Sequence, residues 1–149
     1  LFETLDDHKL PSSCKSNYHR RNDKVSYGFE TIDHVQLAAP PGGEEQARQF
    51  YGELLGFEEI EKPEPLKQRG GVWFQSGSVS LHIGIEDPFV PARKAHPAIR
   101  VNNIEFLKKE LKQKNVSIIV DHDLPGANRF YMYDPFGNRL EFLEWKQED

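Results

Sequence analysis

The sequence predicts an α+β fold built from two copies of one unit, each with a strand, a helix and three further strands. Stretches that alternate apolar and polar residues are interrupted twice by longer stretches in which apolar residues recur at helical spacing. Residues that carry chemistry also recur at matching places. Sixty-two residues separate His34 from His96, and 59 separate His82 from Glu141. A duplicated unit accounts for both intervals.

The first copy is expected to begin with a strand at 32–39, which the following Pro-Pro-Gly-Gly sequence ends. The helix expected at 44–56 has its apolar residues on one face. It begins with two glutamates, which suit the positive end of a helix dipole, and ends in a glycine. Three short strands are expected at 57–61, 71–75 and 79–85, and a Ser-Gly-Ser turn joins the last two.

The second copy is expected to repeat this order. Two asparagines precede its helix and can cap the N-terminus, and lysines lie opposite the apolar face of that helix. An Asp-Pro-Phe-Gly-Asn turn separates the last two strands of the second copy. Its elements are expected at 98–101 (strand), 104–114 (helix), 116–120, 129–133 and 139–145 (strands).

Composition excludes several classes of protein. The chain has 149 residues and a formal charge of −5, so it lacks the broad positive surface that nucleic acids or anionic membranes attract. A single cysteine, Cys14, excludes an internal disulfide framework and a cysteine-based zinc site. Apolar runs are only a few residues long and no signal-peptide pattern is visible, so we expect a cytoplasmic protein.

The domain organisation follows from where the periodicity begins. Residues 1–30 are polar and lack apolar periodicity, so we expect an N-terminal extension outside the core. Residues 31–149 are expected to form one domain, with a first module at about 31–87 and a second at about 95–146. The other three histidines lie in the extension or, as His122 does, in a turn.

Four polar residues stand at equivalent places in the expected strands: His34, His82, His96 and Glu141. Their neighbours in the strands are apolar and point to the opposite face, so the four should share one face. A divalent metal would offset the cost of burying a carboxylate among imidazoles, and Ni, Zn, Mn, Fe or Co suits these ligands. Four ligands, or two histidines and one carboxylate, would leave positions open for a substrate.

Other interpretations of these residues remain open. His82 can be an ordinary half-buried strand residue, and Glu141 can pair with Arg139 or Arg100 across the sheet. Arg129 can hold an anionic substrate or form a salt bridge at the rim.

Strand parity also predicts which residues line the site. Gln36 shares a face with His34, and either Trp73 or Phe74 should point inward as an apolar wall. The candidate substrate-binding residues are Gln36, Arg100, Arg129, Tyr133 and Trp73, and Tyr131 lies on the same face as Arg129 and Tyr133.

The chain resembles the vicinal oxygen chelate superfamily, which includes glyoxalase I, fosfomycin-resistance thiol transferases, bleomycin-resistance proteins, methylmalonyl-CoA epimerase and extradiol dioxygenases. The resemblance covers about residues 32 to 145. The stretches that carry it are IDHVQLA, ARQFYGELLGF, LHIGI, AHPAIRV and RFYMYDPFGNRLEFLEW. The DPFGNRLEFLE ending, with a histidine at the right interval upstream, is its most specific part.

This resemblance implies a fold of two tandem βαβββ modules that form a curled, cup-like mixed β-sheet with helices outside. It implies a divalent metal ion inside the cup, with His34, His96 and Glu141 as the usual ligands and His82 in the fourth position. Small members are usually homodimers, often with each site shared between the two subunits. A small-molecule substrate is the other partner implied.

The departures from each subfamily leave the reaction open. Glyoxalase I typically has a catalytic glutamate where this chain has His82, whose neutral imidazole could take a proton in its place. Fosfomycin enzymes also have the residue that corresponds to Tyr131, so His82, Glu141 and Tyr131 are the catalytic candidates. The functions implied are a glyoxalase-like enzyme with lyase, isomerase or thiol-transfer chemistry, a dimeric resistance protein that sequesters a ligand, or an extradiol-type dioxygenase.

Overall fold

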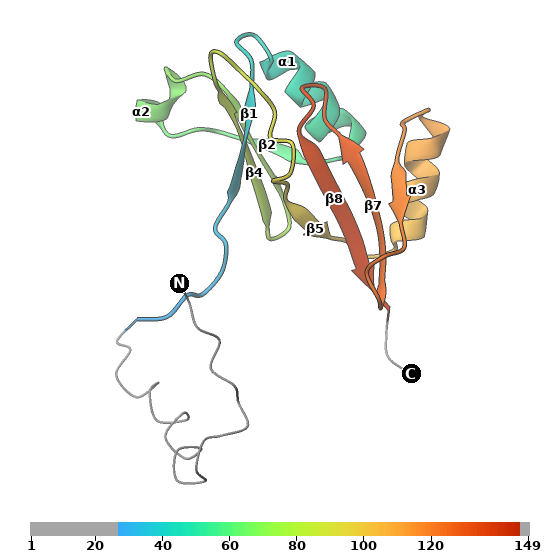
Figure 1. The fold of residues 1–149 in the computed structure, drawn as a ribbon. Helices are drawn as coiled ribbons and strands as arrows, with labels where there is room; N and C mark the ends of the chain where they lie inside the picture. The colour runs from blue at the N-terminus through green and yellow to red at the C-terminus, as the bar shows by residue number, and fades with distance from the viewer. Residues whose placement is uncertain (1–26, 147–149) are drawn as a thin grey trace, which may run out of the picture. The chain divides into compact units, whose positions relative to one another are not determined.

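The computed structural model describes residues 27–146 (Figure 1). Contacts within the chain separate a unit that ends at Ile32 from a compact unit, Asp33–Asp149, which contains every regular element. Most of the expected extension at 1–30, including Cys14, lies outside the described residues. No helix in the described part of the chain is long and apolar enough to cross a membrane.

The first module folds in the expected order. Its strands form a four-stranded sheet in the order β1-β4-β3-β2, with β1 parallel to β4 and the other neighbours antiparallel. Its elements are β1 (Val35–Ala39), α1 (Glu44–Ala47), η3 (Arg48–Leu54), β2 (Glu58–Ile60), α2 (Glu64–Lys67), β3 (Val72–Ser76) and β4 (Val79–Ile85). The short helix α2 was not predicted, because one turn is too short to show helical periodicity.

The second module repeats this topology. Its sheet has the order β5-β8-β7-β6, again with the first strand parallel to the last. Its elements are β5 (Ala98–Arg100), α3 (Ile104–Gln113), β6 (Ile119–Asp121), β7 (Ala127–Tyr133) and β8 (Arg139–Trp145). The expected strand at 116–120 begins later in the structure because Val116 and Ile118 pack against the core before pairing starts.

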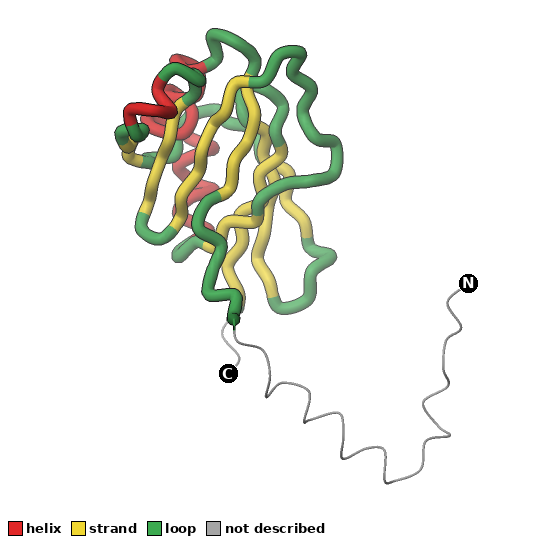
Figure 2. Tube along the Cα trace, turned by 90° about the vertical axis from the view of Figure 1, so that its left-hand side faces the viewer, coloured by secondary structure: helices red, strands yellow, loops and turns green. Residues whose placement is uncertain are grey.

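The predicted α+β class and the two βαβββ modules are confirmed. The expected cup-like sheet is present as two mixed sheets of four strands each. Figure 2 faces the first sheet and shows its strands running side by side, with the helices behind and beside them. In both sheets the first strand of the module, β1 or β5, is an edge strand.

The helix expected at 44–56 begins as α1 and continues as the π-helix η3. The widening shows in the backbone, where the Leu55 amide donates to the Phe50 carbonyl five residues earlier, at 3.1 Å. Phe50 and Tyr51 are both buried in this segment.

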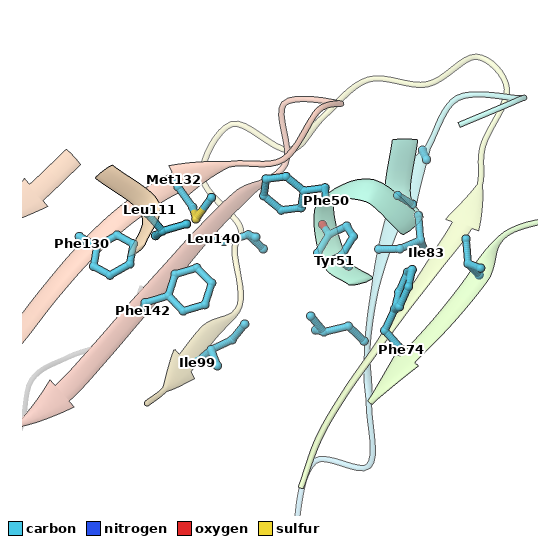
Figure 3. Packing of buried hydrophobic residues seen from close by; sticks show 14 of the residues in the cluster. Phe50, Tyr51, Phe74, Ile83, Ile99, Leu111, Phe130, Met132, Leu140 and Phe142 are labelled. Carbon is cyan, nitrogen blue, oxygen red and sulfur yellow. The ribbon is translucent and has the colours of Figure 1, made fainter. Parts of the chain in front are cut away.

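One hydrophobic core is shared by both modules. Figure 3 shows Phe50 and Tyr51 of η3 between residues of the first sheet, such as Phe74, and residues of the second sheet, such as Leu140 and Phe142. Leu81 and Ile83 of β4 and Leu140 and Phe142 of β8 are all buried, as strand alternation predicts. The side chains between them, His82 and Glu141, therefore face away from this core.

A buried polar network ties the two modules together. The Tyr51 hydroxyl donates to the Asp134 carboxylate at 2.7 Å. The Asn138 side-chain amide donates both to Asp134 and to the Ala38 carbonyl in β1, each at 2.7 Å. Because these residues belong to the Asp-Pro-Phe-Gly-Asn turn, the turn fixes the β7–β8 hairpin against η3 and β1.

Candidate functional site

The strand register places the candidate ligands at equivalent positions in the two sheets. Gln36 of β1 lies opposite His82 of β4, and Ala98 of β5 lies opposite Glu141 of β8. His34 precedes Gln36 by two residues, and His96 precedes Ala98 by two. The intervals in the sequence therefore correspond to the same places in the duplicated fold.

The first sheet carries a stack of three aromatic rings, which we call the histidine stack. The His82 ring lies between the Trp73 ring, whose centroid is 3.8 Å away, and the His34 ring, whose centroid is 4.1 Å away. The Trp73 and His82 planes differ by only 2°. Of the two residues that strand parity offered as the inward wall, Trp73 faces the site and Phe74 faces the core.

The surroundings of the two histidines differ. His82 is buried, and this burial, the charge of His34 and the charge of Lys62 lower its pKa. The lowered pKa favours the neutral imidazole, which is the form that binds a metal or accepts a proton. His34 is exposed, and its Nδ1 atom lies 2.7 Å from the Asp33 carboxylate.

The second sheet carries a group that we call the carboxylate cluster, formed by Asp121, Arg129, His96 and Glu141. His96 Nε2 lies 2.9 Å from one oxygen of the buried Glu141, and Arg129 lies 3.3 Å from the other. Arg129 also contacts Asp121 at 2.7 Å. The pKa of Asp121 is lowered because its carboxylate accepts the Asp123 amide and the Arg129 guanidinium.

The Tyr131 ring lies next to the carboxylate cluster. It is buried, and the ring of His96 stands edge-on to it with centroids 5.6 Å apart. The Arg139 guanidinium carbon lies 4.0 Å from the Tyr131 ring centroid, which is a cation–π distance. Tyr131 also lies directly opposite Glu141 in the β7–β8 register.

The remaining candidate residues are more loosely placed. Arg100 and Tyr133 are exposed, and Tyr133 is 53% exposed. Gln36 is exposed too, and its side-chain amide lies over Gly84. Glu141 does not pair with Arg139 or Arg100, as one interpretation allowed, because Arg129 occupies its free oxygen.

The four candidate ligands do not meet within one chain. Residues 27–146 contain no group of three His, Cys, Asp or Glu side chains placed to hold a metal ion. The ligands form two pairs instead, His34 with His82 and His96 with Glu141. The donor atoms are of the right kind for a divalent transition metal, but each pair supplies only part of a coordination shell.

A family model described as "Glyoxalase/Bleomycin resistance protein/Dioxygenase superfamily" matches residues 31–142. The chain belongs to this superfamily. The match extends over both modules, in keeping with the duplicated βαβββ architecture.

Individual members of the superfamily are also similar to this chain. A Bos taurus protein named "Methylmalonyl-CoA epimerase, mitochondrial" is 31% identical in an alignment of 110 residues, and the match covers 65% of this chain and 61% of that protein's length. A solved structure of a glyoxalase-family protein from Bacillus anthracis is 53% identical, with a TM-score of 0.80 over 82% of this chain and all of that one. A glyoxalase family protein from Enterococcus faecalis is 28% identical, with a TM-score of 0.63 over 78% of this chain and 98% of its own.

Some residues of the site were not found from the sequence. Asp33, which contacts His34, and Arg139, which covers Tyr131, were not assigned these contacts. Asp121 pairs with Arg129 across the β6–β7 hairpin, and that hairpin was the one whose first strand was placed too early. An alignment of 119–121 against 129–131 about the Gly126 turn would have identified the pair.

Proposed function

We propose that this superfamily member is a divalent-metal-dependent enzyme that acts on a small molecule bound to the metal through two vicinal oxygens. The observation that carries the proposal is the orientation of His96. Its Nδ1 atom lies 2.8 Å from the Lys94 carbonyl, an acceptor that requires a proton on Nδ1. The other ring nitrogen, Nε2, faces a Glu141 oxygen, so the two atoms are placed to share a cation between them, either a proton or a metal ion.

The distance between these two donor atoms supports the same proposal. His96 Nε2 lies 2.9 Å from the Glu141 oxygen, so both atoms are close enough to bind one divalent metal ion. His34 has a similar arrangement, because Asp33 occupies its Nδ1 atom and leaves Nε2 as the donor.

We also propose that two copies of the chain share each site. Each pair of ligands needs the other, and one chain keeps the two pairs apart. The edge strands β1 and β5 lie beside the two pairs and are paired on one side only within the described residues. A homodimer in which the first module of one copy meets the second module of the other would bring His34 and His82 to His96 and Glu141.

When bound, the metal would act as a Lewis acid that polarises the oxygens of the substrate. The chain's own residues hold and orient the substrate. Trp73 supplies a flat apolar wall. Tyr131 lies opposite Glu141 in the β7–β8 register, and the Arg139 guanidinium covers its ring. His82 and Glu141 are the candidate proton acceptors on these faces.

Metal content tests the first proposal. The protein purified without chelators should hold close to one equivalent of a divalent metal per chain by elemental analysis. His96→Ala and Glu141→Ala should each retain less than about a tenth of an equivalent, because each removes one of few ligands. His122→Ala, which changes an exposed histidine in a turn, is the matched control and should retain the metal.

Two results would contradict the metal proposal. One is a wild-type protein that stays metal-free after incubation with Ni, Zn, Mn, Fe or Co salts. The other is full metal content in both ligand variants. In the first case, sequestration of a ligand without turnover becomes the better account of the fold.

Mixing two inactive variants tests the shared site. A chain with His34→Ala and His82→Ala has an intact second module, and a chain with His96→Ala and Glu141→Ala has an intact first module. Unfolded together and refolded as a mixture, they should regain about a quarter of the wild-type metal content, because half of randomly formed dimers are mixed and each holds one complete site. Sites formed within one chain would give no recovery.

A further inference from the structure

A small pocket lies beside the histidine stack, on the same face of the first sheet. Its volume is about 190 Å³, and its walls include Gln36, Lys62, Arg69, Trp73 and Gly84. Trp73 belongs to both features, because one face of its ring covers His82 while the residue also lines the pocket. Gln36 lies opposite His82 in the β1–β4 register. A molecule held at the histidine stack can therefore extend into this pocket.

Gly84 leaves room for the Gln36 side chain at the pocket wall. A Cβ atom at Gly84 would lie 2.9 Å from Gln36 Nε2, so the Gln36 amide would have to move from its present position. This amide gives the pocket two hydrogen-bond donors at its inner end.

Two cations that form no salt bridge within the described residues line the same pocket. No carboxylate in residues 27–146 lies within 4.0 Å of Lys62 or Arg69. The contrast is with Arg129, which is paired with Asp121 and Glu141.

Lys62 has hydrogen-bond donors that remain available to a ligand. Lys62 donates to the Gly70 carbonyl, and its ammonium group has two further protons to give. The carboxylate of Glu44 lies beside Gly70 and accepts the Gly71 amide. That hydrogen bond lowers the pKa of Glu44, and the charge of Lys62 adds to the effect, although the two groups form no salt bridge.

We propose that this pocket binds an anionic group of the substrate, a carboxylate or a phosphate, through Lys62, Arg69 and the amide of Gln36. The inference rests on the proposed function, because it assigns the pocket to the end of the substrate remote from the metal-bound oxygens. The volume fits this role, since pockets that hold a whole small molecule are typically about 300–1,000 Å³. The substrate class is then a vicinal-oxygen compound that carries an acidic group.

Calorimetric titration of the purified, metal-containing protein with inorganic phosphate and with acetate tests the proposal, at an ionic strength fixed with sodium chloride. At least one of the two anions should bind, and the anion that binds more tightly identifies the acidic group. Lys62→Gln and Arg69→Gln should each weaken that binding about tenfold, because each removes a charge-assisted hydrogen bond. Lys112→Gln, an exposed lysine on α3, is the matched control and should leave binding unchanged.

The proposal is overturned if neither anion binds, or if binding is as tight in both pocket variants as in the wild type. Metal content, measured on the same samples, separates this result from a failure of the proposed function. Pocket variants that keep their metal and lose the anion support both ideas. Anion binding that depends on Lys62 in a protein unable to hold metal supports the pocket alone.

Discussion

Arg129 shows what the sequence reveals about a single residue and what it does not. Strand parity predicts that Arg129 and Tyr131 share a face, and the structure adds that Tyr131 lies directly opposite Glu141 in the β7–β8 register. Parity did not identify the partner Asp121, because an ion pair across a hairpin depends on where the turn lies, and a shift of one residue moves every side chain to the other face. Both oxygens of Glu141 are consequently occupied, one by His96 and one by Arg129.

Replacement of Asp121 should have an effect that depends on pH. The Asp123 amide and the Arg129 guanidinium lower the pKa of Asp121, so the folded state favours its carboxylate. A group whose pKa is lowered by folding stabilises the protein above its unfolded pKa, and loses that contribution as the pH falls through its folded pKa. Asp121→Asn should therefore lower the free energy of unfolding at pH 7 and have little effect well below pH 3.8.

Urea unfolding of the wild type and the variant at several pH values measures this difference. Asp123→Asn keeps the backbone amide that Asp121 accepts and serves as the control. A deficit in Asp121→Asn that is the same at every pH would show that the pair with Arg129 does not depend on the ionised carboxylate.

The two helices illustrate how far element boundaries follow from the sequence. The helix in the second module was predicted to within one residue of its observed range, because its leucines and its asparagine cap give clear signals. The helix in the first module was placed correctly, yet nothing in its apolar spacing distinguishes α1 from the π-helix η3. That widening depends on how Phe50 and Tyr51 fit between two sheets, which is a property of tertiary packing.

The cap of α3 gives a prediction at the same scale. Asn103 has a left-handed backbone, with φ of 56°, and its side chain accepts the Phe106 amide. Asn103→Ala loses the acceptor and places a Cβ-bearing residue in a conformation that it disfavours, so it should cost about 1–2 kcal/mol. Asn103→Gly loses the same acceptor but tolerates this φ, and should cost only about a few tenths of a kcal/mol.

Chemical denaturation ranks these two variants. Equal destabilisation by both would mean that the backbone conformation contributes nothing and that only the hydrogen bond matters. If Asn103→Gly were the less stable of the two, the left-handed backbone of Asn103 could not explain the cost of Asn103→Ala.

The duplicated fold was largely predictable for the whole molecule, and the assembled site was not. The repeat, the strand order and the separation of His82 and Glu141 from the core all follow from local patterns. The contact between modules depends on residues far apart in the chain, such as Tyr51 and Asp134, and no local pattern identifies such pairs. The four candidate ligands that parity predicts on one face lie in the described residues as two separate pairs, one in each module.

The shared core predicts that the two modules unfold as one unit. Trp73 lies in the first sheet and Trp145 in the second, so each tryptophan reports on one module. Trp145→Phe and Trp73→Phe leave one reporter each, and their urea transitions should each coincide with the loss of helical circular dichroism in the same variant. Fluorescence and circular dichroism transitions that occur at different urea concentrations would show that the modules unfold separately.

The duplication also sets up an electrical asymmetry. His82 and Glu141 occupy the same position in the two copies, so the second copy has a negative charge where the first has a neutral ring. Beside the first sheet, Lys62 and Arg69 form no salt bridge within the described part of the chain, whereas Asp121 of the second sheet is paired with Arg129. A ligand that contacts both faces therefore experiences a more positive electrostatic potential at one end than at the other. Two halves descended from one unit can therefore tell the two ends of a molecule apart, which two identical halves could not do.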